Sequence, residues 1–328
     1  MHSQIESGKG KTYMEKKKID ISRDTRQNLI IIGVLLLAII IFASISKYFL
    51  KWDNIVAILV AAVPLGLVAI SESNCLMVGG FDMSVGYVAC FSGIIWTTLI
   101  SVNHWSTYPA LAIALLFGLA SGTLAGASVA LLNMPPWMTT FALMNIWQGC
   151  SLIVTGGDAV RMTKFKDFKW LGQADLFAKI PPMVILLILI YIIMYCVHKY
   201  TKLGRDLFVV GGNPEAAKNA GINAVRAKMF AFMISGFLAA LAGALFASRS
   251  GSGQPKVGAM YAMQGIAAAT IGGTKAGKTN LAMTFVGAVF IMLVQNGLNM
   301  IQVPAFYQYI TTGVILVLAI LLQTEKRK

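Results

Sequence analysis

Charged residues are scarce in this sequence of 328 residues: 12% are Asp, Glu, Lys or Arg, whereas 57% are hydrophobic, and the mean hydropathy is +0.72. Soluble globular domains carry about 25% charged and about 45–50% apolar residues. So little charge leaves too little polar surface to cover a water-soluble fold. The composition therefore excludes a cytosolic enzyme, a secreted disulfide scaffold and a disordered chain, and it predicts an all-α membrane protein.

Patterns that carry catalytic or metal chemistry are also missing. The four cysteines lie far apart without the spacing of a metal or redox motif, and the three histidines are isolated. Between Asp82 and Asp158 there is no charged residue. We therefore predict no catalytic residue and no metal site in this chain. The scarcity of ionisable residues in apolar segments also argues against a proton-coupled transporter.

Long apolar runs dominate the sequence from residue 28 onward. Because about 20 apolar residues span a bilayer, we predict about ten transmembrane helices in a single transmembrane domain, 28–324, between a basic tail, 1–27, and a C-terminal tail, 325–328. The predicted spans are 28–46, 54–71, 84–101, 109–132, 138–155, 182–198, 229–247, 260–273, 281–299 and 306–322. The segment 260–273 is short for a span.

Positive charge predicts the orientation of these spans. The chain has 27 Lys and Arg against 13 Asp and Glu, a net charge of +14. Cytoplasmic loops are enriched in Lys and Arg, and two-thirds of these residues fall on segments that are inside when both termini are inside. We therefore predict a multi-pass protein of a cytoplasmic membrane with both termini inside, and no nucleic-acid partner is needed to explain the charge.

A faint internal similarity links residues 118–140 with residues 287–307. Both stretches run from a glycine through small residues to an Asn-Met pair, followed by proline and an aromatic residue. If they are equivalent, spans 2–5 match spans 7–10, and the offset of five spans reverses direction across the bilayer. Inverted repeats of this kind recur in transporters. Apolar sequences also resemble one another by chance, so the repeat stays an open prediction.

The first motif is Gly-Gly-Phe-Asp-Met-Ser-Val-Gly, residues 79–86, where predicted spans 2 and 3 meet. Its candidate residues are Gly79, Gly80, Asp82, Ser84 and Gly86. Glycines let the backbone leave helical geometry, and non-helical backbone inside a membrane must be surrounded by protein or water. The motif therefore predicts a broken helix beside a pathway. The alternative is an ordinary loop in which Asp82 or Ser84 caps the next helix.

The second motif occupies the most basic internal loop that is predicted to lie inside. Asn213, Pro214 and Glu215 follow the order of an N-cap, a first-turn proline and an acid near the positive end of a helix, and Gly221 ends that helix. A short capped helix of this kind is suited to docking, and a connector without a partner is the alternative. The candidate residues are Gly204, Arg205, Asn213, Pro214, Glu215, Ala216, Ala217 and Gly221.

The third motif, residues 272–279, matches the phosphate-loop pattern G-x-x-x-x-G-K-T. A phosphate loop needs a strand before it and a soluble α/β domain around it, whereas apolar segments lie on both sides here. We interpret Gly272 and Gly273 as part of a structural turn near a pathway. A membrane NTPase is the alternative that this match leaves open.

Uncharged amides recur in or beside the apolar segments. Such groups can hydrogen-bond a neutral, polyhydroxylated solute, and they can also join helices to one another. We take them as candidate pathway residues, with helix association as the alternative. They are Asn133, Asn145, Gln148, Gln264 and Asn296.

Together these motifs resemble the permease subunits of ribose/galactose/xylose-type ABC sugar importers, within the branched-chain amino acid/ribose permease superfamily. Residues 79–86 resemble that family's Gly-Gly-x-Asp-Leu-Ser-Val-Gly signature, and Gly204-Arg205 with residues 211–222 resembles its cytoplasmic coupling segment. The similarity runs in order over about residues 50–320. It implies a type II ABC importer-like fold with a coupling loop at about 199–228. It also implies a permease that carries a sugar or sugar-like solute by alternating access.

The resemblance also implies partners. These are ABC ATPase subunits that hold ATP and Mg²⁺, so that this chain itself needs no cofactor, an extracytoplasmic solute-binding protein, and a second permease. Two stretches depart from the family pattern: Tyr261 to Gln264 lack the usual acidic pair, and Lys275 to Lys278 replace further paired glycines. A heterodimer with a paralogous permease would explain both departures, and a homodimer is the alternative. An ion-coupled secondary transporter remains the alternative class.

Overall fold

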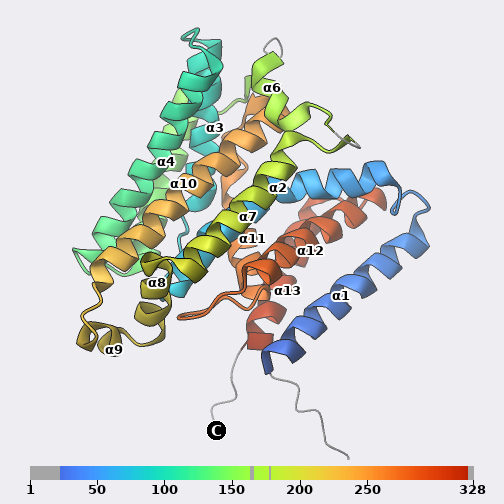
Figure 1. Ribbon diagram of the computed structural model, residues 1–328. Helices are drawn as coiled ribbons and strands as arrows, with labels where there is room; N and C mark the ends of the chain where they lie inside the picture. Colours follow the sequence, from blue (N-terminus) through green and yellow to red (C-terminus); the bar gives the residue numbers. More distant parts are fainter. Residues whose placement is uncertain (1–22, 163–165, 177–178, 324–328) are drawn as a thin grey trace, which may run out of the picture.

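A computed structural model describes residues 23–162, 166–176 and 179–323; most of the predicted basic tail and all of the predicted C-terminal tail lie outside these described residues. The described part is a bundle of helices (Figure 1). The helices are α1 (Arg23–Ile45), α2 (Trp52–Met77), α3 (Val85–Ser101), α4 (Thr107–Ala130), α5 (Pro136–Thr155), α6 (Lys166–Gln173), α7 (Pro182–Tyr200), α8 (Lys202–Gly212), α9 (Pro214–Asn219), α10 (Ala224–Ser250), α11 (Gly258–Ile271), α12 (Leu281–Met300) and α13 (Ala305–Gln323). Two short strands, β1 (Val160–Arg161) and β2 (Ser252–Gly253), pair in antiparallel register.

Each predicted span coincides with a helix of the described part, namely α1 to α5, α7 and α10 to α13. By length and composition, six helices among the described residues are long and apolar enough to cross a membrane: α1, α2, α4, α7, α10 and α12. The 14 residues of α11 extend only about 21 Å at 1.5 Å per residue. Hydropathy did not reveal α6, α8, β1 or β2, because these short elements lie in polar loops between the apolar runs.

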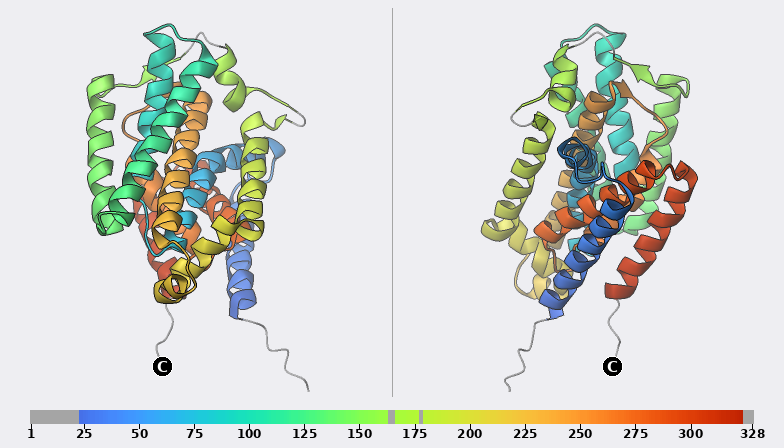
Figure 2. Two further views of the ribbon diagram at one scale, coloured as in Figure 1. Left: turned by 60° about the vertical axis from the view of Figure 1, so that its left-hand side comes forward. Right: turned by 90° about the vertical axis from the view of Figure 1, so that its right-hand side faces the viewer.

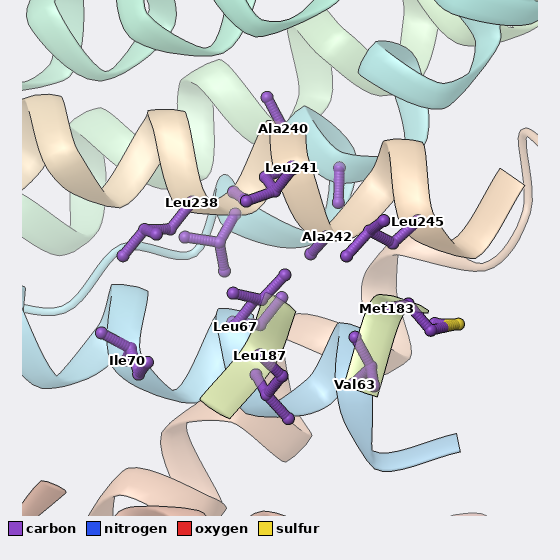
Figure 3. Close-up of a cluster of buried hydrophobic side chains, with 14 of the residues drawn as sticks. Val63, Leu67, Ile70, Met183, Leu187, Leu238, Ala240, Leu241, Ala242 and Leu245 are labelled. Carbon is purple, nitrogen blue, oxygen red and sulfur yellow. The ribbon is translucent and has the colours of Figure 1, made fainter. Parts of the chain in front are cut away.

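The core lies around α2 and α10. All residues of α2 from Ala62 to Cys75 are buried, and so are all residues of α10 from Leu238 to Leu245. Figure 3 shows Leu67 of α2 between α2 and the leucines of α10, and Leu187 of α7 beside α2. Over these two stretches the helices are buried on all sides, as expected for the centre of a bundle.

Small residues let the central helices approach one another closely. On α4, a Cβ added to Gly122 would lie 3.0 Å from the Gly236 nitrogen and the Met233 Cα of α10, and on α10 a Cβ added to Gly243 would overlap the Ala89 carbonyl of α3. Close backbone approach favours helix association where packing, rather than the hydrophobic effect, joins helices. By contrast, α1 lies along the outside of the bundle (Figure 2) and exposes apolar side chains such as Leu37 and Ile40.

Candidate functional site

The chain leaves helical geometry between α2 and α3, at residues 78–84. Gly79 has φ +82, a conformation that favours glycine, and Gly80 lies against Pro136 of α5. Side chains accept the backbone N–H groups that follow: Glu72 Oε2 accepts from Asp82 N at 3.1 Å, and Thr140 Oγ1 accepts from Met83 N at 3.1 Å. The non-helical segment is therefore held by side chains of α2 and α5.

Asp82 lies at the centre of a buried polar cluster. Its carboxylate accepts hydrogen bonds from Ser84 N at 3.0 Å, from Ser84 Oγ, and from Ser235 Oγ of α10 at 3.0 Å. Ser71 of α2 donates to the Ser235 carbonyl at 2.6 Å. Asp82 thus bonds the backbone two residues ahead, while Ser84, the N-cap of α3, makes no capping bond with its side chain.

Sequence reasoning named Asp82 and Ser84 but missed Glu72, Ser71 and Ser235 as members of this cluster. A signal was present, because Ser71-Glu72-Ser73-Asn74 interrupts the apolar sequence of α2 with four polar residues. All four are buried. Buried polar groups need partners, so this run predicts a polar contact without revealing that Ser235 supplies it.

The first turns of the two shortest apolar helices meet inside the bundle. A Cβ added to Gly86 of α3 would overlap the Gly258 carbonyl of α11. Beside this contact lies a cavity of about 10 Å³, lined in part by Cys90, Gln254 and Tyr261. That volume holds about one water molecule, so almost no open space remains beside the contact between α3 and α11 in this conformation.

The predicted coupling loop folds into α8 and α9. The Thr201 side chain accepts from Gly204 N at 3.1 Å, and Asn213 Oδ1 accepts from Ala216 N at 2.9 Å, so each helix has the side-chain cap that its sequence favours. Gly221, with φ +70, follows the end of α9. Ala217 is fully buried, whereas Pro214, Glu215 and Ala216 are exposed. The exposed residues therefore form the outer face of α9.

This loop packs against the end of α2. Ala217 joins Met77, Leu207, Val210 and Ala231 in one apolar cluster. Two glycines of α8 make the contact close: a Cβ at Gly211 would overlap the Met77 carbonyl, and a Cβ at Gly204 would overlap the backbone of Val197 and His198. Arg205 is exposed beside this contact.

The motif of residues 272–279 forms a hairpin that also contacts α8 and α2. Lys275 and Lys278 exchange backbone hydrogen bonds of 2.9 Å, and Gly277 N donates to the Met77 carbonyl at 2.9 Å. Gly273, with φ +79, donates to Thr270, and Gly272 packs against Thr284. A phosphate loop directs such N–H groups at a phosphate. Here they bond protein carbonyls, so the geometry argues against the membrane NTPase.

The amide candidates lie apart from one another. Asn133 occupies the turn between α4 and α5 with φ +53, Asn145 is exposed and bonds its own helix, and Gln148 is half-buried on α5. Gln264 is buried on α11, and Asn296 Nδ2 donates to Asn54 Oδ1 at 3.0 Å, joining α12 to α2. The structure does not gather these five residues into one site.

A bundle of buried, interrupted helices with a capped helical segment packed on one end defines the chain as an integral-membrane transport subunit. Comparison with known proteins identifies its family. Residues 54–320 match the family of permease components of branched-chain amino acid transport systems, and the chain belongs to this family, which includes the permeases of sugar ABC importers. It is therefore a multi-pass protein of the bacterial inner membrane.

Several curated relatives are similar over most of their length. The chain is 31% identical to the ribose import permease protein of Haemophilus influenzae, over 88% of this chain and 90% of the relative. It is 30% identical to the L-arabinose ABC transporter permease of Azospirillum brasilense, over 90% and 88%. It is also 30% identical to the D-allose transport system permease of Escherichia coli, over 88% and 89%. No solved structure matches the chain.

Proposed function

We propose that this permease forms the translocation pathway for a neutral monosaccharide or a similar solute, while partner ATPases bind and hydrolyse ATP with Mg²⁺. The relatives are named for ribose, L-arabinose and D-allose, which are all neutral sugars. The scarcity of charge in the apolar segments suits such a solute. The observation that carries the proposal is α9, a capped helix with an exposed outer face and a buried inner face.

The packing of α8 and α9 offers a route by which the movement of a docked ATPase can be transmitted to the helices of the bundle. Gly211 and Gly277 both contact the backbone of Met77, the last residue of α2. Directly beyond it begins the interrupted segment whose Asp82 bonds α10. A displacement of α9 would therefore act on α2, α3 and α10 together. We take this as the basis of alternating access.

The distribution of loops supports ten spans with both termini inside. The hairpin 272–280 and the loop 199–223, both predicted inside, meet at the end of α2. Loops predicted outside meet one another as well, because β1 pairs with β2 and Lys179 Nζ lies 2.9 Å from Asp53 Oδ1. In Figure 1, α6 lies at the end of the bundle opposite to α8 and α9.

The helix contacts support the inverted repeat of spans 2–5 and 7–10. In this assignment α2, α3, α4 and α5 correspond to α10, α11, α12 and α13. Each set has a long helix, an interruption, a short helix and two further helices. The contacts correspond too: α2 packs on α11 and α12, and α10 packs on α3 and α4. The short helices α3 and α11 would then each follow an interruption of the helical backbone beside the pathway, as interrupted helices do in other transporters.

The remaining partners follow from this orientation. A solute-binding protein would dock on the end that carries α6 and β1, and a second permease would complete the pathway. The altered sequences near Gln264 and Lys278 favour a paralogous partner over a second copy of this chain. Co-expression with candidate permease genes, followed by purification through a tag on this chain, measures which partner assembles with it.

The coupling proposal is tested by a charge reversal on the outer face of α9. Glu215→Lys should abolish co-purification of the ATPase and solute uptake by the reconstituted importer, while the amount of permease in the membrane stays unchanged. The matched control is Asp175→Lys, which makes the same reversal at an exposed acid in the loop between α6 and α7. It should leave ATPase co-purification intact. Equal ATPase binding by both variants would overturn the docking assignment.

The energy source is tested separately from the docking face. Uptake of radiolabelled ribose, arabinose or allose should require the ATPase and ATP, and it should survive collapse of the ion gradients by ionophores. Uptake that persists without any ATPase and disappears with an ion gradient would instead establish the ion-coupled secondary transporter.

A further inference from the structure

A cavity of about 620 Å³ lies where α1, α7, α8 and the hairpin 272–280 come together. Its described lining contains three cationic side chains, Lys199, Arg205 and Lys278, each from a different element, and no acidic residue. Gln27 and Asn28 of α1 and Thr279 and Asn280 before α12 add polar groups. The proposed function does not use this cavity. Its chemistry is suited to a ligand with concentrated negative charge and several hydrogen-bond acceptors.

An apolar groove of about 490 Å³ continues from this cavity along α7 and α12. On α7 it is formed by Ile188, Tyr191, Ile192 and Tyr195, whose spacing places them on one face of the helix. Ile188 is 49% exposed and Ile192 is 54% exposed. Three residues, Tyr195, Leu281 and Ala282, line both the cavity and the groove, so the two are contiguous.

The ammonium group of Lys199 lies at the junction between the cavity and the groove. Lys199 Nζ donates to the Tyr195 hydroxyl at 2.9 Å and lies 5.3 Å from the centre of the same ring. The Lys199 ammonium is thereby kept at the mouth of the groove, on the side of the cavity. A phosphate placed in the cavity would meet Lys199 beside Tyr195, where an attached apolar chain would enter the groove.

We infer that this paired cavity and groove bind one anionic phospholipid, with the phosphate headgroup among Lys199, Arg205 and Lys278 and an acyl chain between α7 and α12. A free anion would use the cavity alone and would leave the groove without a role. A zwitterionic lipid would place its own ammonium among three cations. Basic pockets between membrane helices bind anionic headgroups in this manner. Because Arg205 lies on α8, which leads directly into α9, the lipid would bridge α8 to α1, α7 and the hairpin.

The test is lipid retention by the purified full-length chain, measured by native mass spectrometry. The protein is equilibrated with equal amounts of phosphatidylglycerol and phosphatidylcholine that carry the same acyl chains. The wild type should retain phosphatidylglycerol in preference. The variant Lys199→Gln/Lys278→Gln should lower that retention about thirtyfold, because each lysine near an anionic lipid surface contributes about 1 kcal/mol. Equal retention of the two lipids by the wild type would overturn the inference.

Matched variants separate the site from general charge. Lys47→Gln/Lys51→Gln removes the same charge at the loop between α1 and α2 and should leave retention unchanged. Ala282→Trp, which fills the junction, should reduce retention of phosphatidylglycerol with all three cations present. Equal losses in the two double variants, or full retention by Ala282→Trp, would overturn the inference. Thermal unfolding of each purified variant verifies that it is folded.

Two other occupants give distinct results. If the site serves a free anion, millimolar inorganic phosphate should displace phosphatidylglycerol from the wild type. If a second copy of this chain covers the groove, Ile192→Cys should form a disulfide-linked dimer under oxidation. Either result would overturn the lipid assignment. Retention that is unaffected by phosphate, together with a monomeric Ile192→Cys variant, supports it. Lipid binding is measured without the ATPase, so it stands or fails separately from the coupling proposal.

Discussion

The two interrupted stretches of the bundle are held in different ways. Residues 78–84, between α2 and α3, depend on side chains, since Glu72 and Thr140 accept their N–H groups and Asp82 gathers two serines. Residues 251–257, between α10 and α11, depend more on main-chain bonds, since Ser252 pairs with β1 and the Gly251 carbonyl accepts from Met162 N at 2.8 Å. In both stretches the backbone has lost its helical partners and must find others inside a protein.

The difference teaches where each stretch is vulnerable. The first stretch concentrates its hydrogen bonds on a few carboxylate and hydroxyl oxygens, so the loss of one side chain removes several bonds. The second stretch combines main-chain bonds to β1 with single bonds from the side chains of Cys90 and Ser250 to its carbonyls, so no one side chain carries several of them. Side-chain substitutions should therefore lower stability more in the first stretch than in the second. The most sensitive position should be the contact between α3 and α11, the helices that follow the two stretches.

The largest effect is expected where the helices that follow the two stretches meet, at the contact between Gly86 of α3 and Gly258 of α11. Gly86→Val would drive its side chain into the Gly258 carbonyl, which cannot move without displacing α11. Overpacking costs about 1–3 kcal/mol where side chains can adjust, and backbone overlap should exceed that range. We expect almost no folded protein by fluorescence-detected size exclusion. Gly33→Val in α1, where a Cβ meets nothing within 4 Å, is the control and should be neutral.

A substitution in the first stretch should have the next largest effect. Asp82→Ala removes the acceptors of Ser84 N, Ser84 Oγ and Ser235 Oγ. Each buried donor left without a partner costs about 1–3 kcal/mol, so the melting temperature in detergent should fall clearly. Asp82→Asn keeps one carbonyl oxygen and should lose less. Similar melting temperatures for wild type and Asp82→Ala would remove the basis for the contrast between the two stretches.

A substitution in the second stretch should have a small effect. Ser252 is buried, but its hydroxyl contributes one bond, accepted from Gln254 Nε2 at 3.2 Å, while its backbone pairs with Arg161. Ser252→Ala should therefore cost about 0.5–1.5 kcal/mol at most. The direct comparison is its melting temperature against that of Asp82→Ala. If Ser252→Ala proves the more destabilising, side chains rather than backbone hold the second stretch.

The smallest effect is expected at the exposed ion pair beside these loops. The hydrogen bond and charge of Asp53 raise the pKa of Lys179 above its ordinary value. The pair therefore contributes its full stability below the ordinary pKa of lysine and loses it as the pH rises through the raised pKa. Exposed ion pairs contribute little to the free energy of unfolding. We expect the melting temperatures of wild type and Asp53→Asn to differ slightly at neutral pH and to converge at strongly alkaline pH.

Local chemistry predicted local features well. Hydropathy located the segments that form α1 to α5, α7 and α10 to α13, and the order Asn213-Pro214-Glu215 predicted a capped helix that the structure contains. Contacts between distant residues could not be predicted in this way. Ser235 is one of three serines in the apolar helix α10, and only the packing of α10 on α2 brings it to Asp82.

The basic cavity illustrates the same limit. The sequence places Lys199, Arg205 and Lys278 in segments predicted to lie inside, where their charges predict the orientation and Arg205 is also a candidate coupling residue. Their convergence depends on the hairpin 272–280 folding against α8. The hairpin, in turn, was recognisable only as a glycine-rich turn, because its contacts with Met77 and Gly212 join segments far apart in the sequence.

The bond between Asp82 and Ser235 has a consequence for biosynthesis. The two residues are 153 positions apart, and translation at about 5–20 residues per second separates their emergence by roughly 10–30 s. During that interval the nascent first half has a carboxylate in place without the α10 hydroxyl that will bond it. Until α10 is synthesised, the carboxylate needs solvation from water, from the insertion machinery or from lipid headgroups. The order of synthesis, as well as the final packing, therefore limits the positions at which this protein can carry a buried acid.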